Sequence, residues 1–79
     1  MATLRLFAAA REAAGTGRTT ISGSTVQEVV DVAIAEFGPE FARVVESSRI
    51  WLNGEQAEPA DLVGDGDEVA VLPPVSGGC

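Results

Sequence analysis

The 79-residue sequence contains no histidine, no lysine and no tyrosine, and its one cysteine is the last residue, Cys79. Without histidine it offers no evident general base to activate a nucleophile, so we expect a protein that is not itself an enzyme. One cysteine cannot form a disulfide within the chain, and the fold must therefore be stabilised by packing. The absence of lysine also leaves no side-chain amine on which isopeptide chains could be built.

Positive charge is scarce as well: five arginines stand against twelve aspartates and glutamates, which gives a net charge of −7. Such a surface repels nucleic acid and anionic membranes, so neither is an expected partner, and it favours a basic protein partner. No apolar run approaches the roughly 20 residues of a membrane span. Residues 1–7 are too short for a signal peptide, and Arg5 interrupts them. We therefore expect a cytoplasmic protein.

What the chain does have is enough apolar residues for one small packed domain. Hydrophobic residues make up 46% of the sequence, and the mean hydropathy is +0.20. These values argue against disorder and suit a single core. The sequence shows neither an internal repeat nor an internal linker. We expect a domain over residues 1–72 and an extended tail over residues 73–79.

Local patterns predict the order strand, helix, strand, helix, short helix and then three strands. Alternation marks the strands, Asn53-Gly54 is typical of a hairpin turn, and Thr25 with Glu28 fits a capping box at the start of the main amphipathic helix. The expected strands are residues 3–7, 18–22, 49–52, 55–57 and 68–72, and the expected helices are residues 8–14, 26–37 and 39–45. One main helix against a mixed sheet of about five strands is an α+β architecture in two layers.

Alternation also divides the expected sheet into two faces. One face should direct aliphatic side chains at the main helix, and these are Leu4, Leu6, Ile50, Leu52, Val69 and Val71. The opposite face then carries Phe7, Trp51, Ala70 and Leu72. These side chains form an exposed docking patch for a partner, or they belong to the core if a loop or short helix covers Phe7 or Trp51. The residues themselves leave both interpretations open.

The most informative segment is the tail, Pro73-Pro74-Val75-Ser76-Gly77-Gly78-Cys79. Two prolines stop the last strand after Leu72 and stiffen the exit. Two glycines follow that have no side chains to obstruct entry into a narrow site. Residues 73–78 could reach about 20 Å when extended. A frayed terminus is the simplest alternative, but the order of rigid and slender residues and the absence of charge favour a presented, reactive end.

Four segments together resemble one family. The tail, residues 72–78, is similar to that of molybdopterin synthase small subunits, and residues 6–12, 52–55 and 65–70 support the likeness. On these segments the chain resembles the MoaD/ThiS sulfur-carrier proteins, which have the β-grasp (ubiquitin-like) fold. The helix at residues 8–14 resembles MoaD-like members more than the shorter thiamine carriers.

The resemblance implies chemistry at Gly78. An E1-like adenylating enzyme of the MoeB/ThiF type would use ATP to activate the Gly78 carboxyl, and sulfur would then displace AMP and leave a thiocarboxylate that donates sulfur. Molybdopterin biosynthesis, with a larger catalytic subunit of the MoaE type, is the leading pathway, and the chain itself would bind no cofactor. Cysteine, thiamine or another sulfur metabolite is an alternative product. A ubiquitin-like protein conjugator is an alternative class.

Cys79 departs from the family pattern, in which the Gly-Gly pair is terminal, because a Gly78 carboxyl held in an amide cannot be adenylated. Three explanations remain open. Cys79 is encoded and then removed by a peptidase, which is the interpretation we favour; it is a cysteine adduct formed by an S-to-N acyl shift; or it is an engineered addition. The first two imply a JAMM-type zinc peptidase that cleaves between Gly78 and Cys79.

An acidic cluster near the last strand carries no expected metal site. Asp61, Asp65, Asp67 and Glu68 lack the ligand spacing of an EF-hand, and turn chemistry explains Asp65-Gly66-Asp67. Arg11 is most simply a solvated helix residue, but it is also a candidate partner contact. The candidate partner-binding residues are therefore Phe7, Arg11, Trp51 and Leu72.

Overall fold

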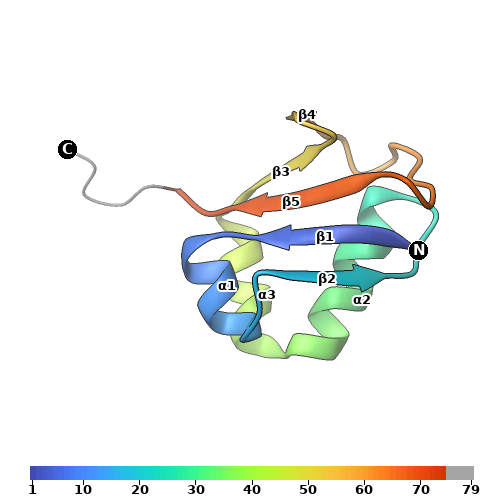
Figure 1. Ribbon diagram of the computed structural model, residues 1–79. Coiled ribbons are helices and arrows are strands. Elements are labelled where there is room, and N and C mark those ends of the chain that lie inside the picture. The colour runs from blue at the N-terminus through green and yellow to red at the C-terminus, as the bar shows by residue number, and fades with distance from the viewer. Residues whose placement is uncertain (75–79) are drawn as a thin grey trace.

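The structure, a computed structural model, describes residues 1–74 (Figure 1). Its strands are β1 (Ala2–Leu6), β2 (Arg18–Ile21), β3 (Arg49–Leu52), β4 (Glu55–Gln56) and β5 (Glu68–Leu72). Its helices are α1 (Ala8–Ala14), α2 (Val26–Phe37) and α3 (Pro39–Glu46). The order of elements predicted from the sequence is confirmed, and their ends are shifted by no more than one residue.

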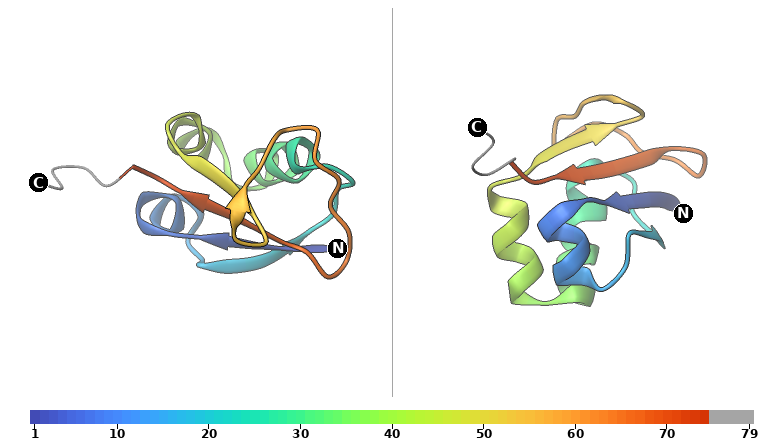
Figure 2. Two further views of the ribbon diagram at one scale, coloured as in Figure 1. Left: turned by 90° about the horizontal axis from the view of Figure 1, so that it is seen from above. Right: turned by 60° about the vertical axis from the view of Figure 1, so that its left-hand side comes forward.

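The first and last strands of the chain lie side by side in the middle of the sheet. The strand order is β2-β1-β5-β3-β4, and β1 pairs with β5 in parallel, with Leu4 opposite Val69 and Leu6 opposite Val71. The other neighbouring strands are antiparallel. The helices lie behind the sheet in Figure 1, and the two views of Figure 2 show the same one-sided arrangement. The predicted α+β architecture in two layers is confirmed.

The core lies between the sheet and the helices, and it follows the alternation that the sequence predicts. The central strands bury Leu4, Leu6, Val69 and Val71. Ile50 and Leu52 of β3 are only partly buried, because β3 lies between β5 and the two-residue edge strand β4, near the border of the sheet. The side chains that α2 buries are Val26, Val29, Val30 and Ala33.

The start of α2 differs in one detail from the expected capping box. Thr25 Oγ1 accepts a hydrogen bond from the Glu28 N–H (3.1 Å), as expected, but the Glu28 carboxylate accepts from the N–H of Ser24 (2.8 Å). Ser24 is held beside the helix start because its carbonyl accepts a hydrogen bond from the N–H of Val63 (2.9 Å). The cap therefore also depends on the loop before β5, a contact that local capping rules do not contain.

The two shorter helices complete the core, a contribution that the sequence analysis did not predict. Ala10 of α1 and Phe41 of α3 are fully buried. Within residues 1–74, Phe41 is the largest of the fully buried side chains. Its ring meets the ring of Phe37 edge to face, with 5.2 Å between the centroids and 61° between the planes. The longest helix is α2, as expected, but α1 also packs on the sheet, and α3 packs against both α1 and α2.

Replacing Phe41 with alanine should lower the free energy of unfolding by about 3–5 kcal/mol, because the change would leave a cavity in the core. Urea unfolding followed by the fluorescence of the single tryptophan, Trp51, measures the loss. Phe41→Leu should lose less, since more of the volume stays filled. Val32→Ala, at an exposed position of α2, should change the value by no more than about 0.5 kcal/mol. Equal losses at both positions would contradict the core role of Phe41.

Candidate functional site

The root of the tail lies at the end of β5. This strand ends at Leu72, and Pro73 and Pro74 lead the chain off the end of the sheet (Figure 1). A hollow of about 380 Å³ lies at this point, and we call it the exit hollow. Its walls are Ser47, Arg49, Trp51, Leu72, Pro73 and Pro74. The exit hollow is therefore built from β3, the end of β5, the residue that follows α3 and the first two residues of the tail.

Strand pairing explains why these residues meet. β3 runs antiparallel to β5, with Arg49 opposite Leu72 and Trp51 opposite Ala70. Directly opposed residues point to the same face of a sheet, and residues two apart on one strand do so as well. Arg49, Trp51 and Leu72 thus share the face that the helices leave uncovered.

This uncovered side, which we call the open face, is turned to the viewer in Figure 1. Alternation and register place on it Thr3, Arg5, Arg18, Thr20, Arg49, Trp51, Gln56, Glu68, Ala70 and Leu72. Phe7, which follows β1, is 38% exposed, and the guanidinium carbon of Arg5 lies 5.5 Å from its ring centroid. Trp51, Ala70 and Leu72 are half-buried. No helix within residues 1–74 covers these side chains, whereas their role in docking stays a prediction.

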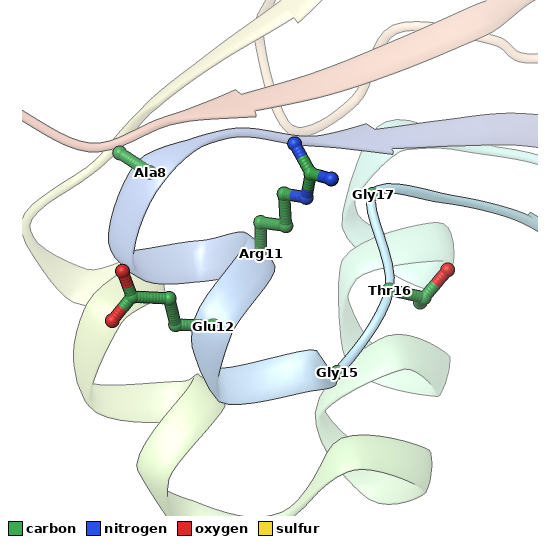
Figure 3. Close-up of a pocket in the computed structure, with 6 residues that line it drawn as sticks. All are labelled: Ala8, Arg11, Glu12, Gly15, Thr16 and Gly17. Atoms are coloured by element: carbon green, nitrogen blue, oxygen red, sulfur yellow. The ribbon is translucent and has the colours of Figure 1, made fainter.

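Arg11 lies apart from the exit hollow. It lines a separate polar pocket of about 520 Å³ between α1 and the turn into β2, together with Glu12 and Thr16 (Figure 3). Its side chain packs beside Gly17, where an added Cβ would lie 3.3 Å from the arginine Nε. The structure therefore brings Trp51 and Leu72 together but does not bring Arg11 to them.

Two walls of the exit hollow, Ser47 and Arg49, were not singled out from the sequence. Ser47 follows the last residue of α3, and Arg49 begins β3. Nothing in their immediate neighbours marks them. The signal that could have found Arg49 is its pairing with Leu72, and that requires knowing the register of two strands far apart in the sequence.

The reactive part of the predicted tail lies outside the described residues. The structure describes the chain as far as Pro74. The remaining candidate site residues are Val75, Ser76, Gly77, Gly78 and Cys79. Their assignments as tail and as cleavage site therefore stay predictions.

Ala8, which joins Phe7 to α1, has an uncommon backbone conformation. Its φ is +50°, in the left-handed region that costs a residue with a Cβ roughly 1–2 kcal/mol. This conformation lets the chain leave β1 and enter α1 with only Phe7 between them. Strained residues of this kind cluster at functional sites, and here the strain adjoins an exposed aromatic ring beside the open face.

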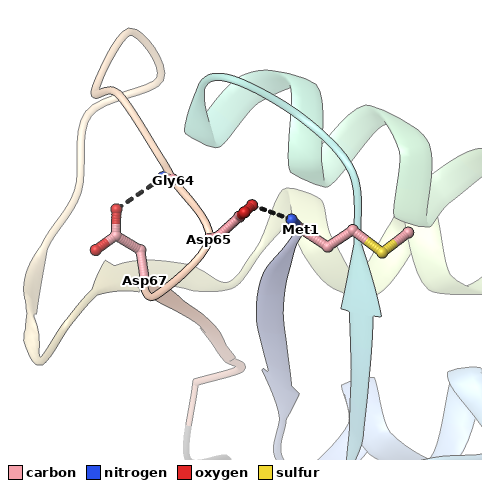
Figure 4. A network of polar contacts seen from close by, with 4 residues as sticks. All are labelled: Met1, Gly64, Asp65 and Asp67. Atoms are coloured by element: carbon pink, nitrogen blue, oxygen red, sulfur yellow. Dashed lines mark hydrogen bonds and ion pairs between the residues drawn. The ribbon is translucent and has the colours of Figure 1, made fainter.

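The acidic turn before β5 is held by an ion pair and hydrogen bonds (Figure 4). The N-terminal ammonium of Met1 contacts the Asp65 carboxylate, and the Gly64 N–H donates to the Asp67 carboxylate (2.8 Å). The hydrogen bond from the ammonium, followed by its charge, lowers the pKa of Asp65. The Gly64 N–H, followed by the side-chain amide of Asn53, lowers the pKa of Asp67.

Asn53 connects this acidic turn to the hairpin between β3 and β4. Its side chain donates to the Asp67 carboxylate (3.0 Å) and accepts from the N–H of Glu68 (2.9 Å). Its φ of +52° lies in the left-handed region, which asparagine tolerates better than most residues, and Gly54 follows with φ +86°. The predicted hairpin turn is confirmed, and it is joined to a second turn.

Within residues 1–74, no three histidine, cysteine, aspartate or glutamate side chains come together as a possible metal site. The hydrogen bonds of the turn account for the position of the Asp67 carboxylate. In the same part of the chain, no helix combines the length and the apolar character that a bilayer span requires.

A sequence model described as the ThiS family matches residues 4–78, and the match ends at Gly78. The chain belongs to the ThiS family. A curated relative of this ThiS-family chain is the molybdopterin synthase sulfur carrier subunit of Arabidopsis thaliana, which is 38% identical over 76 residues. That alignment covers 92% of this chain and 78% of the relative. The family resemblance inferred from the sequence is confirmed.

Solved structures place the ThiS-family chain among ubiquitin-like proteins. The small archaeal modifier protein 1 of Methanosarcina acetivorans matches with a TM-score of 0.87 at 32% identity, covering 98% of this chain and 95% of that one. A chain of the Amycolatopsis orientalis BexX/CysO complex matches with a TM-score of 0.82 at 25% identity, covering 99% of this chain and 100% of that one. The expected β-grasp fold is confirmed.

Replacing Ala8 with glycine should raise the free energy of unfolding by up to about 1 kcal/mol, because glycine adopts a positive φ without steric penalty. Ala9→Gly is the matched control, since Ala9 is the next residue of α1 and has no positive φ. That change should lower the value by roughly 0.5–1 kcal/mol. Urea unfolding of both variants measures the difference, and losses in both would contradict a strained Ala8.

Asp67→Asn should lower stability near neutral pH and have little effect in acid. Because the pKa of Asp67 is lower in the folded protein than its ordinary value of 3.8, the ionised carboxylate stabilises the fold above that pH. This stabilisation is lost as the pH falls through the folded pKa, where the protonated side chain resembles asparagine. Urea midpoints of both proteins, measured from about pH 7 down to about pH 2, should converge at the acid end. A constant gap between them would refute the link to Asp67 ionisation.

Proposed function

We propose that this ThiS-family chain is a sulfur carrier. In this proposal the Gly78 carboxyl is adenylated and converted to a thiocarboxylate, which donates sulfur in molybdopterin biosynthesis. The observation that carries the proposal is the family match, which runs to Gly78. The Arabidopsis relative, named a molybdopterin synthase sulfur carrier subunit, supports the choice of pathway. The proposal places the protein in the cytoplasm, where ATP is available.

The chemistry follows from the properties of a terminal carboxylate. A free carboxylate is a poor electrophile, because its leaving group would be oxide. A carboxylate oxygen of Gly78 attacks the α-phosphate of ATP, releases pyrophosphate and forms an acyl adenylate. Sulfide then displaces AMP from the acyl carbon and leaves the thiocarboxylate. ATP and the catalytic groups belong to an E1-like enzyme of the MoeB/ThiF type, since this chain has no histidine and offers no evident general base.

The geometry of the described residues suits a co-substrate. β5 is a central strand, and it leads directly to Pro73 at the edge of the open face. A partner that covers the open face would therefore also meet the root of the tail. The activating enzyme and a larger catalytic subunit of the MoaE type would each need both features, so they would bind the carrier in turn.

Cys79 must be removed before this chemistry can start, because Gly78 is otherwise held in an amide bond. Hydrolysis by a JAMM-type zinc peptidase would release free cysteine and expose the Gly78 carboxylate. The likeness to a chain of the BexX/CysO complex favours a second candidate, a carrier for cysteine or another sulfur metabolite in which Gly78-Cys79 is an adduct. The likeness to a small archaeal modifier protein favours a third, a protein conjugator.

A version of the chain that ends at Gly78 should gain the mass of one oxygen-to-sulfur exchange when it is incubated with the adenylating enzyme of the same organism, ATP and sulfide. Intact-protein mass spectrometry measures the gain. The chain that ends at Cys79 is the matched control and should stay unchanged, because its Gly78 carboxyl is blocked.

Other products of the same incubation would favour a different function. A ladder of larger protein adducts would favour conjugation. Absence of any sulfur gain in the trimmed chain, under conditions in which the enzyme consumes ATP with it, would overturn the carrier proposal. Mass analysis of the protein from its native cells tests the trimming: a species that ends at Gly78 supports it, and full-length chain alone argues against it.

A further inference from the structure

The open face has a charge opposite to that of the rest of the protein. It carries Arg5, Arg18 and Arg49 against a single carboxylate, Glu68. The remainder of the sequence holds the other two arginines and eleven of the twelve carboxylates. The net charge of −7 therefore conceals one positive surface on an otherwise acidic molecule.

This concentration of arginines does not serve the stability of the sheet. Arg5 and Arg18 are directly opposite each other on β1 and β2, and like charges in that position are destabilising. Arg5 has one ion-pair partner, Glu68, at 3.7 Å, and both side chains are more than a third exposed. Exposed pairs of this kind contribute little. Arg5 also contacts the exposed ring of Phe7, a weak cation–π contact at such a site, and no ion pair within residues 1–74 involves Arg18 or Arg49. The fold thus gains little from its three open-face arginines, and a role in binding explains them better.

Arg49 belongs both to the positively charged open face and to the lining of the exit hollow. It lines the exit hollow beside Trp51, Leu72, Pro73 and Pro74. Among residues 1–74, no carboxylate forms an ion pair with it. The exit hollow is therefore a largely apolar cavity of about 380 Å³ that has the Arg49 guanidinium at its edge. Such a cavity suits a partner's apolar side chain that has a carboxylate beside it.

We propose that the open face and the exit hollow bind an acidic surface of the adenylating enzyme. On that surface an apolar side chain fills the exit hollow, and carboxylates face Arg49, Arg5 and Arg18. This inference rests on the proposed function, since it assigns the surface by which the tail is delivered. It also reverses, for this face, the expectation of a basic partner that the net charge alone gives.

The charge distribution would orient the carrier before contact. An acidic partner is repelled by the carboxylate-rich helices and turns and attracted by the open face, which favours one direction of approach. The acidic turn at Asp65 and Asp67 lies near the start of β5, whereas Arg49 is paired with Leu72 at its end. The attraction is therefore strongest near the root of the tail, and the tail is directed at the enzyme.

Charge reversal at Arg49 tests the proposal on the intact 79-residue chain. Arg49→Glu should lower the association rate constant with the immobilised adenylating enzyme about tenfold at a salt concentration of about 0.05 M. At about 0.5 M the difference should shrink to less than about threefold, because salt screens exposed charges. Surface plasmon resonance measures both constants.

Arg43→Glu is the matched control. Arg43 lies on α3, behind the sheet and well exposed, and its reversal changes the net charge by the same amount. It should alter the association rate constant by less than about twofold, because Arg43 is not on the open face and already lies beside the Glu40 carboxylate (3.7 Å). Equal effects of the two reversals would overturn the proposal and leave only a general charge effect.

Trp51→Ala tests the contribution of the apolar contact in the exit hollow to binding, separately from that of the arginine charges. It should raise the dissociation rate constant about tenfold at both salt concentrations, because the exit hollow loses a wall. Circular dichroism confirms that each variant is folded, and Arg49→Gln, with an intermediate effect, replaces Arg49→Glu should that variant not fold. An intact chain that does not bind the enzyme overturns this inference. A chain that binds but never gains sulfur after trimming overturns the proposed function alone.

Discussion

The parallel pairing of β1 with β5 is the constraint on which the rest of the structure depends. It joins the first strand of the chain to the last one and sets both in the middle of the sheet. Because parallel neighbours end at the same edge, β1 leads into Phe7 and α1 at the edge where β5 leads into Pro73. The exposed aromatic ring, the exit hollow and the root of the tail share one end of the molecule for this reason.

Much of the fold could be read from the sequence because it is encoded locally. Alternation in β1 and β5 predicted the buried residues Leu4 and Val69, and the spacing of apolar residues predicted α2 with its start at Thr25. The full burial of Phe41 could not be read, since a short helix gives little periodicity and its depth depends on the helices beside it. The hydrogen bond between the side chains of Asn53 and Asp67 could not be predicted either. It joins two turns, and the local sequence of each turn explains that turn without the other.

The candidate site was less predictable than the fold because it is assembled across strands. The likeness of the tail pointed to Gly78, and alternation turned Trp51 and Leu72 outward, but Arg49 enters the exit hollow only through its register with Leu72. Net charge is limited in a related way, since a sum over the chain does not say which face holds the cations. Strand order and register show that three of the five arginines share the open face, and the proposed docking surface rests on that distribution.

The central place of the last strand also couples assembly of the protein to completion of its synthesis. β5 is made last, and without it β1 and β3 have no common neighbour. The sheet therefore cannot close on a nascent chain until Leu72 has left the ribosome, and pairing of such distant segments is slow compared with local structure. A polypeptide ended early by a premature stop codon would lack the middle of its sheet. Such a chain would stay unfolded and be degraded by proteases, so that a product truncated before the end of β5 would not accumulate in the cell.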